Sequence, residues 1–159
     1  MPKIDLSKAP VLTGSRYPAP HDEPCRARSA LRLSEASGLT RIGVNLVTLD
    51  PGAWASQRHW HAHEDEFVML VSGELVLVED DGETILRAGD CAAHPAGVPN
   101  GHHLQNRSDQ PATFLVVSNR DPADHGEYSD IDMRFTAGRN TGGGGYEHKD
   151  GTPYPKRDD

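Results

Sequence analysis

Short apolar runs separated by turn residues dominate the middle of the chain. These runs lie at Ser29–Leu33, Thr40–Leu49, Phe67–Val71, Glu74–Glu79, Glu83–Arg87, Cys91–His94, His103–Asn106 and Thr113–Ser118. Turn-forming triplets such as DPG at 50–52 and DDG at 80–82 stand between them. Runs of this kind, closed by Gly, Pro, Asp or Asn, are typical of an antiparallel sandwich or barrel. Since no window holds a 3.6-residue apolar period of helical length, the pattern predicts an all-β fold.

One run is apolar on both of its faces. Leu75–Val78 reads LVLV, whereas a strand with one face in water would alternate apolar and polar residues. One face would then line the barrel, and the other would meet a second sheet or a second subunit. This pattern favours a homodimer, but a central strand inside one sandwich gives the same pattern.

The polar ends of the chain set the expected domain boundaries. Residues 1–24 are Pro-rich and predict an irregular arm, and residues 25–120 form the predicted barrel. Residues 121–159 predict a polar C-terminal extension, with one short element around Ile131–Phe135. Four consecutive glycines predict a flexible linker at 138–145. The whole length of 159 residues suits a single domain.

Charge and cysteine content narrow the function classes. The net charge of −8 and the lack of a Lys/Arg cluster argue against nucleic acid and against anionic membrane surfaces as partners. No stretch approaches the ~20 apolar residues of a membrane span, and the N-terminus lacks the apolar core of a signal peptide. Two cysteines, Cys25 and Cys91, are too few for a disulfide framework, so we expect a cytoplasmic protein.

The candidate chemistry begins with two histidines spaced two residues apart. In a strand, side chains at positions i and i+2 point to the same face, so His59 and His61 can meet one cation. Glu66 follows beyond a turn-like AHED stretch and can bring a carboxylate to the same place. Imidazole with carboxylate suits Zn, Fe, Mn, Ni, Cu or Co better than Ca or Mg. His63 shares the facing of the pair, but its place in the apparent turn favours a surface role.

A second histidine pair follows a loop punctuated by PAG and PNG. His102 and His103 stand at the start of a predicted strand, and only one of two adjacent residues faces the lumen. The facing of the pair alone leaves open whether His102 or His103 does so, since a bulge in the loop would reverse it.

These two segments resemble the paired motifs of the cupin family. The first motif is matched by Gly52, six residues, His59-Trp60-His61, four residues, Glu66, six residues and Gly73. The second is matched by Gly89, five residues and Pro95-Ala96-Gly97. There the spacing departs: His102 and Asn106 restore His-x-x-x-Asn two residues later than the pattern has it. The chain is most similar to small single-domain bacterial cupins, some of them labelled sugar-phosphate isomerase-like.

The resemblance implies a fold, a ligand set and a cofactor. The fold would be a cupin double-stranded β-helix, that is, a jelly-roll barrel. The ligands would be His59, His61, Glu66 and His102, holding a divalent transition metal (Zn, Fe, Mn, Ni, Cu or Co).

Several functions suit such a site. The first hypothesis is a metal-dependent enzyme for a small oxygen-rich substrate, with isomerase-like action on a sugar or hydroxy-carbonyl compound suggested by the resemblance alone. Lyase and dioxygenase chemistry are alternatives, because the fold does not choose among them. A non-enzymatic small-ligand sensor or binding cupin is a further alternative, as is a vestigial site in a dimerisation scaffold. No catalytic base is identified from the sequence.

Overall fold

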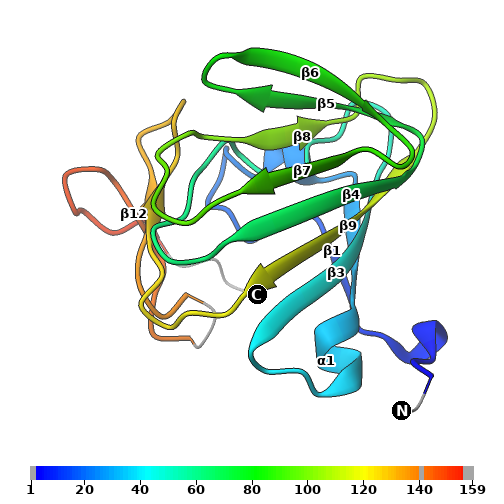
Figure 1. Cartoon of the computed structure of the whole chain (residues 1–159). Coiled ribbons are helices and arrows are strands. Elements are labelled where there is room, and N and C mark those ends of the chain that lie inside the picture. The colour runs from blue at the N-terminus through cyan, green and yellow to red at the C-terminus, as the bar shows by residue number, and fades with distance from the viewer. Residues whose placement is uncertain (1–2, 140–141, 156–159) are drawn as a thin grey trace.

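A six-stranded antiparallel sheet forms one side of the molecule (Figure 1). The computed structural model describes residues 3–139 and 142–155. In spatial order the strands are β1 (Val11–Thr13), β2 (Arg28–Arg32), β3 (Ile42–Leu49), β9 (Ala112–Asn119), β4 (Glu66–Ser72) and β7 (Cys91–His94). Strands distant in the chain, such as β3 and β9, are therefore direct neighbours, as a jelly roll requires.

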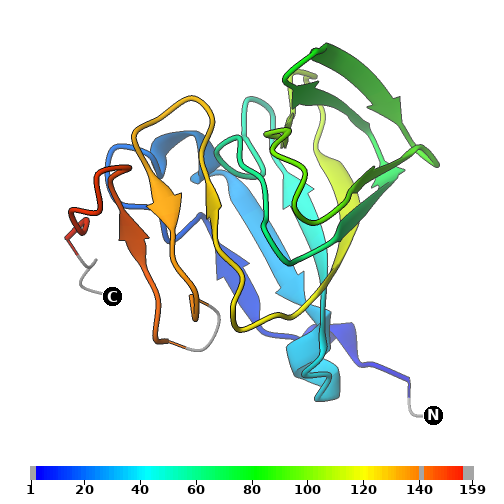
Figure 2. The same cartoon turned by 60° about the vertical axis from the view of Figure 1, so that its left-hand side comes forward.

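Two smaller sheets complete the fold. One contains β6 (Gly82–Arg87), β5 (Glu74–Glu79) and β8 (His103–Gln105), and the other contains β10 (Gly126–Glu127), β11 (Arg134–Phe135) and β12 (Tyr146–Glu147). Across residues 3–139 and 142–155, helical structure is limited to η1 (Leu6–Lys8), η2 (Glu23–Cys25) and α1 (Leu33–Ser37). No helix in the described ranges is long and apolar enough to cross a membrane. The all-β prediction is confirmed, and Figure 2 shows the β10–β12 sheet beside the N-terminal strands.

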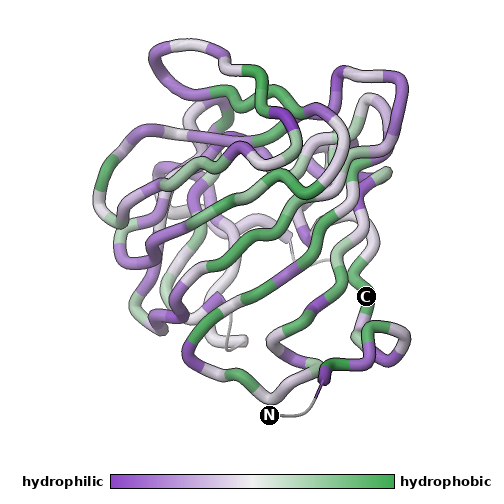
Figure 3. Tube along the Cα trace, turned by 45° about the vertical axis from the view of Figure 1, so that its right-hand side comes forward, coloured by the Kyte–Doolittle hydropathy of each residue, from purple (hydrophilic) through white to green (hydrophobic). Residues whose placement is uncertain are grey.

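The main core lies between the six-stranded sheet and the β6-β5-β8 sheet. Hydrophobic stretches run along the strands of the large sheet (Figure 3), and the buried residues of the strands form this cluster: Ala30, Val47, Leu49, Ala53, Val68, Leu70, Leu75, Leu77, Leu86, Leu104, Ala112 and Phe114. In β5, Leu75 and Leu77 are buried and Val76 and Val78 are half-buried, so one face of the LVLV run is more buried than the other. A homodimer stays a prediction.

The glycine that ends the first motif has a steric reason. Gly73 joins β4 to β5 with φ of 83°, in the left-handed region where other residues are strained. A Cβ atom there would lie 2.7 Å from the Cβ of Ala112, closer than real contacts allow. Glycine therefore lets the chain turn tightly against the start of β9.

Both polar ends hold more structure than their composition indicates. In the N-terminal arm, expected to be irregular, Val11–Thr13 pairs with β2 as strand β1. The C-terminal extension contributes Tyr128, Met133 and Phe135 to a second buried cluster, together with Tyr17 and Cys25. The element expected around Ile131–Phe135 is present as β11. The flexibility of the linker at 138–145 stays a prediction, and its residues 140–141 lie outside the described ranges.

Candidate functional site

His59 and His61 lie in an extended segment between β3 and β4, not in a regular strand as expected. His59 forms isolated β-bridges with His102 and with Tyr128. The extended backbone still turns both buried imidazoles to one side, and their Nε2 atoms are 3.1 Å apart. His59 and His61 therefore point to the same side, as predicted, although they do not lie in a regular strand.

Hydrogen bonds at Nδ1 determine which ring nitrogen of each histidine is free. The Nδ1 of His59 lies 2.8 Å from the carbonyl oxygen of Gln57, and the Nδ1 of His61 lies 2.7 Å from Oδ2 of Asp124. A carbonyl or carboxylate oxygen only accepts, so each Nδ1 carries the proton and donates it. The lone pairs of the two neutral rings are then on the Nε2 atoms, which face each other.

The two facing nitrogens can share either a proton or a metal cation. Burial lowers the pKa of His59 well below its usual range, and His61 and His102 lower it further, so His59 itself stays neutral. Neighbouring ligand atoms on an ion bound at about 2.1 Å are about 3 Å apart, close to the observed Nε2 separation. A buried imidazole with its Nδ1–H held by an oxygen acceptor is also the usual state of a metal-binding histidine.

Glu66 and His102 form a second close pair beside the first. The Nε2 of His102 lies 3.6 Å from Oε1 of Glu66 and is buried without a hydrogen-bond partner among the described residues. Its Nδ1 faces the carbonyl oxygen of Asn100 at 3.2 Å, so Nε2 again has the lone pair. Burial raises the pKa of the Glu66 carboxyl, but His102, His59 and His61 more than reverse this and bring it to about 2. Glu66 is therefore an anion, and the His102 Nε2 beside it meets it through a proton when the ring is charged or through a shared cation when the ring is neutral.

His94 holds the ring of His102 in place. The two imidazoles stack with centroids 3.5 Å apart and planes at 4°. Burial and the neighbouring His102 lower the pKa of His94 to about 4, so its ring is neutral at pH 7. The stacked ring of His94 therefore has a structural role, since it limits rotation of His102.

His103, the competing candidate, faces away from this group. Its Nδ1 lies 3.0 Å from the carbonyl oxygen of Ser56, and its Nε2 lies 2.9 Å from the amide nitrogen of Gln105. Trp54 packs edge-on against the ring at 4.8 Å. Because both ring nitrogens have partners, His103 has no lone pair free for a ligand, and the fold brings His102 to Glu66 instead.

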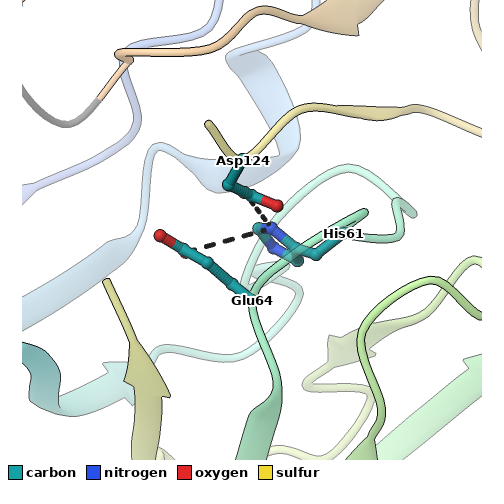
Figure 4. A group of neighbouring side chains, drawn as sticks. All are labelled: His61, Glu64 and Asp124. Carbon is teal, nitrogen blue, oxygen red and sulfur yellow. Dashed lines mark hydrogen bonds and ion pairs between the residues drawn. The ribbon is translucent and has the colours of Figure 1, made fainter. Parts of the chain in front are cut away.

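A second cluster, which sequence reasoning missed, involves the C-terminal extension. His61, Glu64 and Asp124 are buried, and their ligand atoms all lie within 4.8 Å of one another (Figure 4). Such a cluster is able to hold a metal ion. Asp124 also accepts from the backbone N–H of His63 at 3.0 Å. Burial raises the pKa of Asp124, but the hydrogen bonds from His61 and His63 outweigh this and lower it.

Arg139 supplies the positive charge of this second cluster. Its Nη2 atom is 3.5 Å from both Glu64 and Asp124 and 3.3 Å from Nδ1 of His61. The guanidinium lies 4.1 Å above the ring centre of Phe135. Two carboxylates therefore share one guanidinium and one histidine N–H, which satisfies the buried charges without another cation.

The extension reaches the site by pairing with the motif segment. The N–H of Trp60 donates to the carbonyl of Glu127, and the N–H of Ala62 donates to that of His125. Gly126 makes this approach possible, since a Cβ atom there would lie 1.9 Å from the carbonyl oxygen of Trp60. No composition or spacing in the sequence points to this contact, because its partners are more than 60 residues apart.

His63, Gln57 and the two cysteines lie outside this group. His63 is exposed, as its turn position indicated. The amide of Gln57 donates to the carbonyl of His21 at 2.7 Å and so has a structural partner. Cys25 is a buried free thiol, and Cys91 is an exposed one.

A cavity of about 310 Å³ opens beside the histidines, large enough for a small organic molecule. Its lining includes His59, His61, Glu64 and Glu66. The inner face of the large sheet supplies apolar lining from Val47, Phe114 and Val116. The two carboxylates and the two histidines thus meet at a pocket wall and not in a solid core.

An antiparallel jelly roll with a histidine–carboxylate group at the wall of a pocket defines the cupin class of β proteins. Residues 45–118 match the Cupin domain family. The chain is 49% identical to a sugar phosphate isomerase of the cupin superfamily from Silicibacter pomeroyi, with 97% of each chain covered and a TM-score of 0.91. This protein therefore belongs to the cupin superfamily.

More distant relatives share the fold alone. A protein from Acidithiobacillus ferrooxidans described as a putative sugar phosphate isomerase is 24% identical, covers 82% of this chain and 81% of its own, and has a TM-score of 0.71. The polyketide cyclase RemF from Streptomyces resistomycificus is 18% identical, with a TM-score of 0.62 over 76% of this chain and 80% of its own. No curated protein sequence matches. Because the two relatives are described by different chemistries, the fold does not select the reaction.

Proposed function

We propose that this cupin is a metal-dependent isomerase that acts on a small sugar or hydroxy-carbonyl compound. The observation that carries the proposal is the set of three buried histidines whose Nδ1 atoms face oxygen acceptors and whose Nε2 atoms lie in close pairs, His59 with His61 and His102 with Glu66. The similarity to a sugar phosphate isomerase supports the reaction class.

The metal ligands in this proposal are His59, His61, Glu66 and His102. They lie as two close pairs, and the unpartnered Nε2 of His102 is the atom that most needs a cation. Three imidazoles and one carboxylate suit a divalent transition ion such as Zn, Fe, Mn, Ni, Cu or Co.

The second cluster is the alternative metal site, and two features favour the first. Arg139 already balances Glu64 and Asp124, and a dication placed there would be repelled by its guanidinium. Moreover, the proton on His61 Nδ1 points at Asp124, so the nitrogen facing this cluster has no free lone pair. Asp124 then orients His61 for binding through Nε2.

The chemistry follows from the pocket wall. When bound, the metal would act as a Lewis acid that polarises a substrate carbonyl. Isomerisation also needs a base that moves a proton between neighbouring carbons. Glu64 is the carboxylate other than Glu66 among the described residues lining the cavity, so we assign it this proton transfer. Its Oε1 accepts from the N–H of Asp121 at 3.1 Å, and its Oε2 lies near Arg139, which together fix its position.

Metal analysis with matched histidine variants tests the ligand set. We expect His102→Ala to lower metal content well below that of the wild type, and His103→Ala to leave it unchanged. Equal loss in both variants, or metal loss in Glu64→Gln with retention in Glu66→Gln, would contradict the assignment. Cobalt-substituted protein adds a spectroscopic measure that does not depend on activity.

Proton exchange in D₂O tests the reaction. An isomerase should incorporate deuterium beside the carbonyl of its aldose or ketose substrate, and NMR detects this without knowledge of the product. We expect Glu64→Gln to abolish exchange while metal content is kept. Metal-bound protein that exchanges no proton in a panel of sugars and sugar phosphates would favour a binding cupin instead. Oxygen consumption would favour a dioxygenase, and carbon–carbon bond cleavage a lyase.

A further inference from the structure

The cavity beside the histidines has a basic lining in an acidic protein. The chain has a net charge of −8. Yet two glutamates, Glu64 and Glu66, face five arginines across the cavity: Arg16, Arg28, Arg32, Arg120 and Arg139. A second cavity of about 380 Å³ shares four of these arginines, so they line the route between the two cavities as well. This concentration of one sign of charge needs an explanation, because inward-facing charges are costly without partners.

Two of the five arginines already have carboxylate partners. Arg32 forms an ion pair with Glu35, and Arg139 balances Glu64 and Asp124. Arg16, Arg28 and Arg120 take part in no ion pair among residues 3–139 and 142–155. These three have no carboxylate at ion-pair distance, although Glu66 acts electrostatically on Arg28 in the same cavity.

Arg28 is the most constrained of the three. Its position in β2 has the inward facing of the buried Ala30, so its side chain enters the cavity and does not lie in solvent. One Nη1 hydrogen bond, 3.0 Å to the carbonyl of Gly14, holds the guanidinium against the segment after β1. Its Nε is buried and has no hydrogen-bond partner among the described residues. The side chain is thus anchored at one nitrogen and leaves further donors unsatisfied.

The surroundings of Arg28 suit an oxyanion. The segment after β1 adds Ser15, Arg16 and Tyr17 to the same lining, and Arg120 approaches from the end of β9. Guanidinium groups bind phosphate and carboxylate through paired N–H donors. A ligand anchored here would extend along the lining toward His59 and Glu66, which belong to the same cavity.

We propose that Arg28, flanked by Arg16 and Arg120, binds the anionic group of the ligand, a phosphate or a carboxylate, while the rest of the ligand reaches the histidines. This inference rests on the proposed function for the part of the ligand that reacts at the histidines. Beyond the proposed function, the ligand is an anion, and these arginines recognise its charge.

Calorimetric titration with inorganic phosphate and with succinate tests the subsite without any reaction. We expect millimolar or tighter binding of one anion, and the tighter of the two identifies the group. Arg28→Gln should weaken binding at least tenfold, and Arg28→Lys, which keeps the charge but loses the planar fork, should weaken it less. Arg87→Gln is the control, since Arg87 is exposed on β6 and pairs with Glu74. Circular dichroism checks that each variant is folded, and Arg120→Gln repeats the test if Arg28→Gln is not.

A His59→Ala arm separates this proposal from the proposed function. Phosphate or succinate binding that persists in metal-depleted His59→Ala protein supports the arginine subsite even if the metal reaction fails. Binding that disappears with the metal but is unchanged in Arg28→Gln would assign the anion to the metal and overturn the proposal. Absence of binding of both anions to the wild type, or equal losses in Arg28→Gln and Arg87→Gln, would overturn it as well.

Discussion

The strands that carry the cupin motifs and the C-terminal extension build the same site by different means. Between β3 and β9, long antiparallel strands bury a large apolar core, and the register of β4 with β9 places Glu66, while His59 and His102 pair through an isolated bridge. The extension has strands of two residues each, and it positions Arg139 over the ring of Phe135 and Asp124 beside the backbone hydrogen bond from Ala62 to His125. The first region supplies the candidate ligands, and the second orients and charge-balances them. A polar, glycine-rich composition therefore does not mark a segment as unimportant to a site.

The largest effect on stability should come from removing a buried aromatic side chain from the core of either region. Phe135 and Phe114 are 1% and 4% exposed, so Phe→Ala at either position should cost roughly 3–5 kcal/mol of unfolding free energy. If the two regions unfold together, both variants shift one urea transition measured by circular dichroism. A separate early transition affected by Phe135→Ala alone would show that the extension folds independently.

The contact between the two regions is testable at one glycine. Gly126→Ala places a Cβ against the carbonyl of Trp60 and the ring of Phe135, and we expect a loss of roughly 1–3 kcal/mol in urea unfolding. Gly143→Ala is the matched control, because a Cβ there meets nothing within 4 Å. Equal stability of the two variants would contradict the close approach of β10 to the motif segment.

The orienting role of the extension is tested at Asp124. Asp124→Asn weakens the hold on His61 Nδ1, and we expect metal affinity to fall about 10- to 100-fold. Asp132→Asn removes a similar contact, 2.8 Å to His148, that lies on the surface, and it should leave affinity unchanged. Competition with a chelator measures both. An affinity loss larger than that of Glu66→Gln would instead favour the cluster of His61, Glu64 and Asp124 as the metal site.

The smallest effect should come from the exposed ion pair between the regions. Arg58 binds Asp130 through two hydrogen bonds of 2.6 and 2.9 Å, which lower the pKa of Asp130. Because Asp130 is 56% exposed, Asp130→Asn should cost only about 0.2–1 kcal/mol at pH 7. Because the pKa of Asp130 is lower in the folded state, its ion pair stabilises the protein at pH values above the unfolded-state pKa of about 3.9. This stabilisation is lost as the pH falls through the folded-state pKa. The wild-type advantage should therefore vanish in urea titrations at low pH.

The sequence predicted most of what depends on local pattern. Short apolar runs bounded by turn residues placed eight strands with small shifts at their ends, as in β8, predicted at His103–Asn106 and present at His103–Gln105. The i, i+2 spacing predicted the shared facing of His59 and His61, and the resemblance to the cupin motif favoured His102 over His103. The metal-ligand assignment itself stays a prediction, which the chelation and histidine experiments address.

The parts of the site that the sequence did not predict depend on contacts between residues far apart in the chain. Asp124 meets His61 across 63 residues, and Arg139 meets it across 78. Their segment has short strands without visible alternation, so neither its burial nor its facing follows from composition. The arginine lining was equally hidden, because Arg28, Arg32 and Arg120 are scattered in sequence and share one cavity only through sheet order.

The long separation between His61 and Asp124 also has a consequence for the timing of assembly. During synthesis the motif segment leaves the ribosome well before residues 124–139. Because a domain folds as a unit, this one cannot complete its fold until those later residues are available. Contacts between residues distant in the chain require loop closure, whose entropy cost slows the folding of β proteins. We therefore expect His61 to reach its final orientation among the last steps of folding. Metal loading would then follow the completion of the chain and would not guide it.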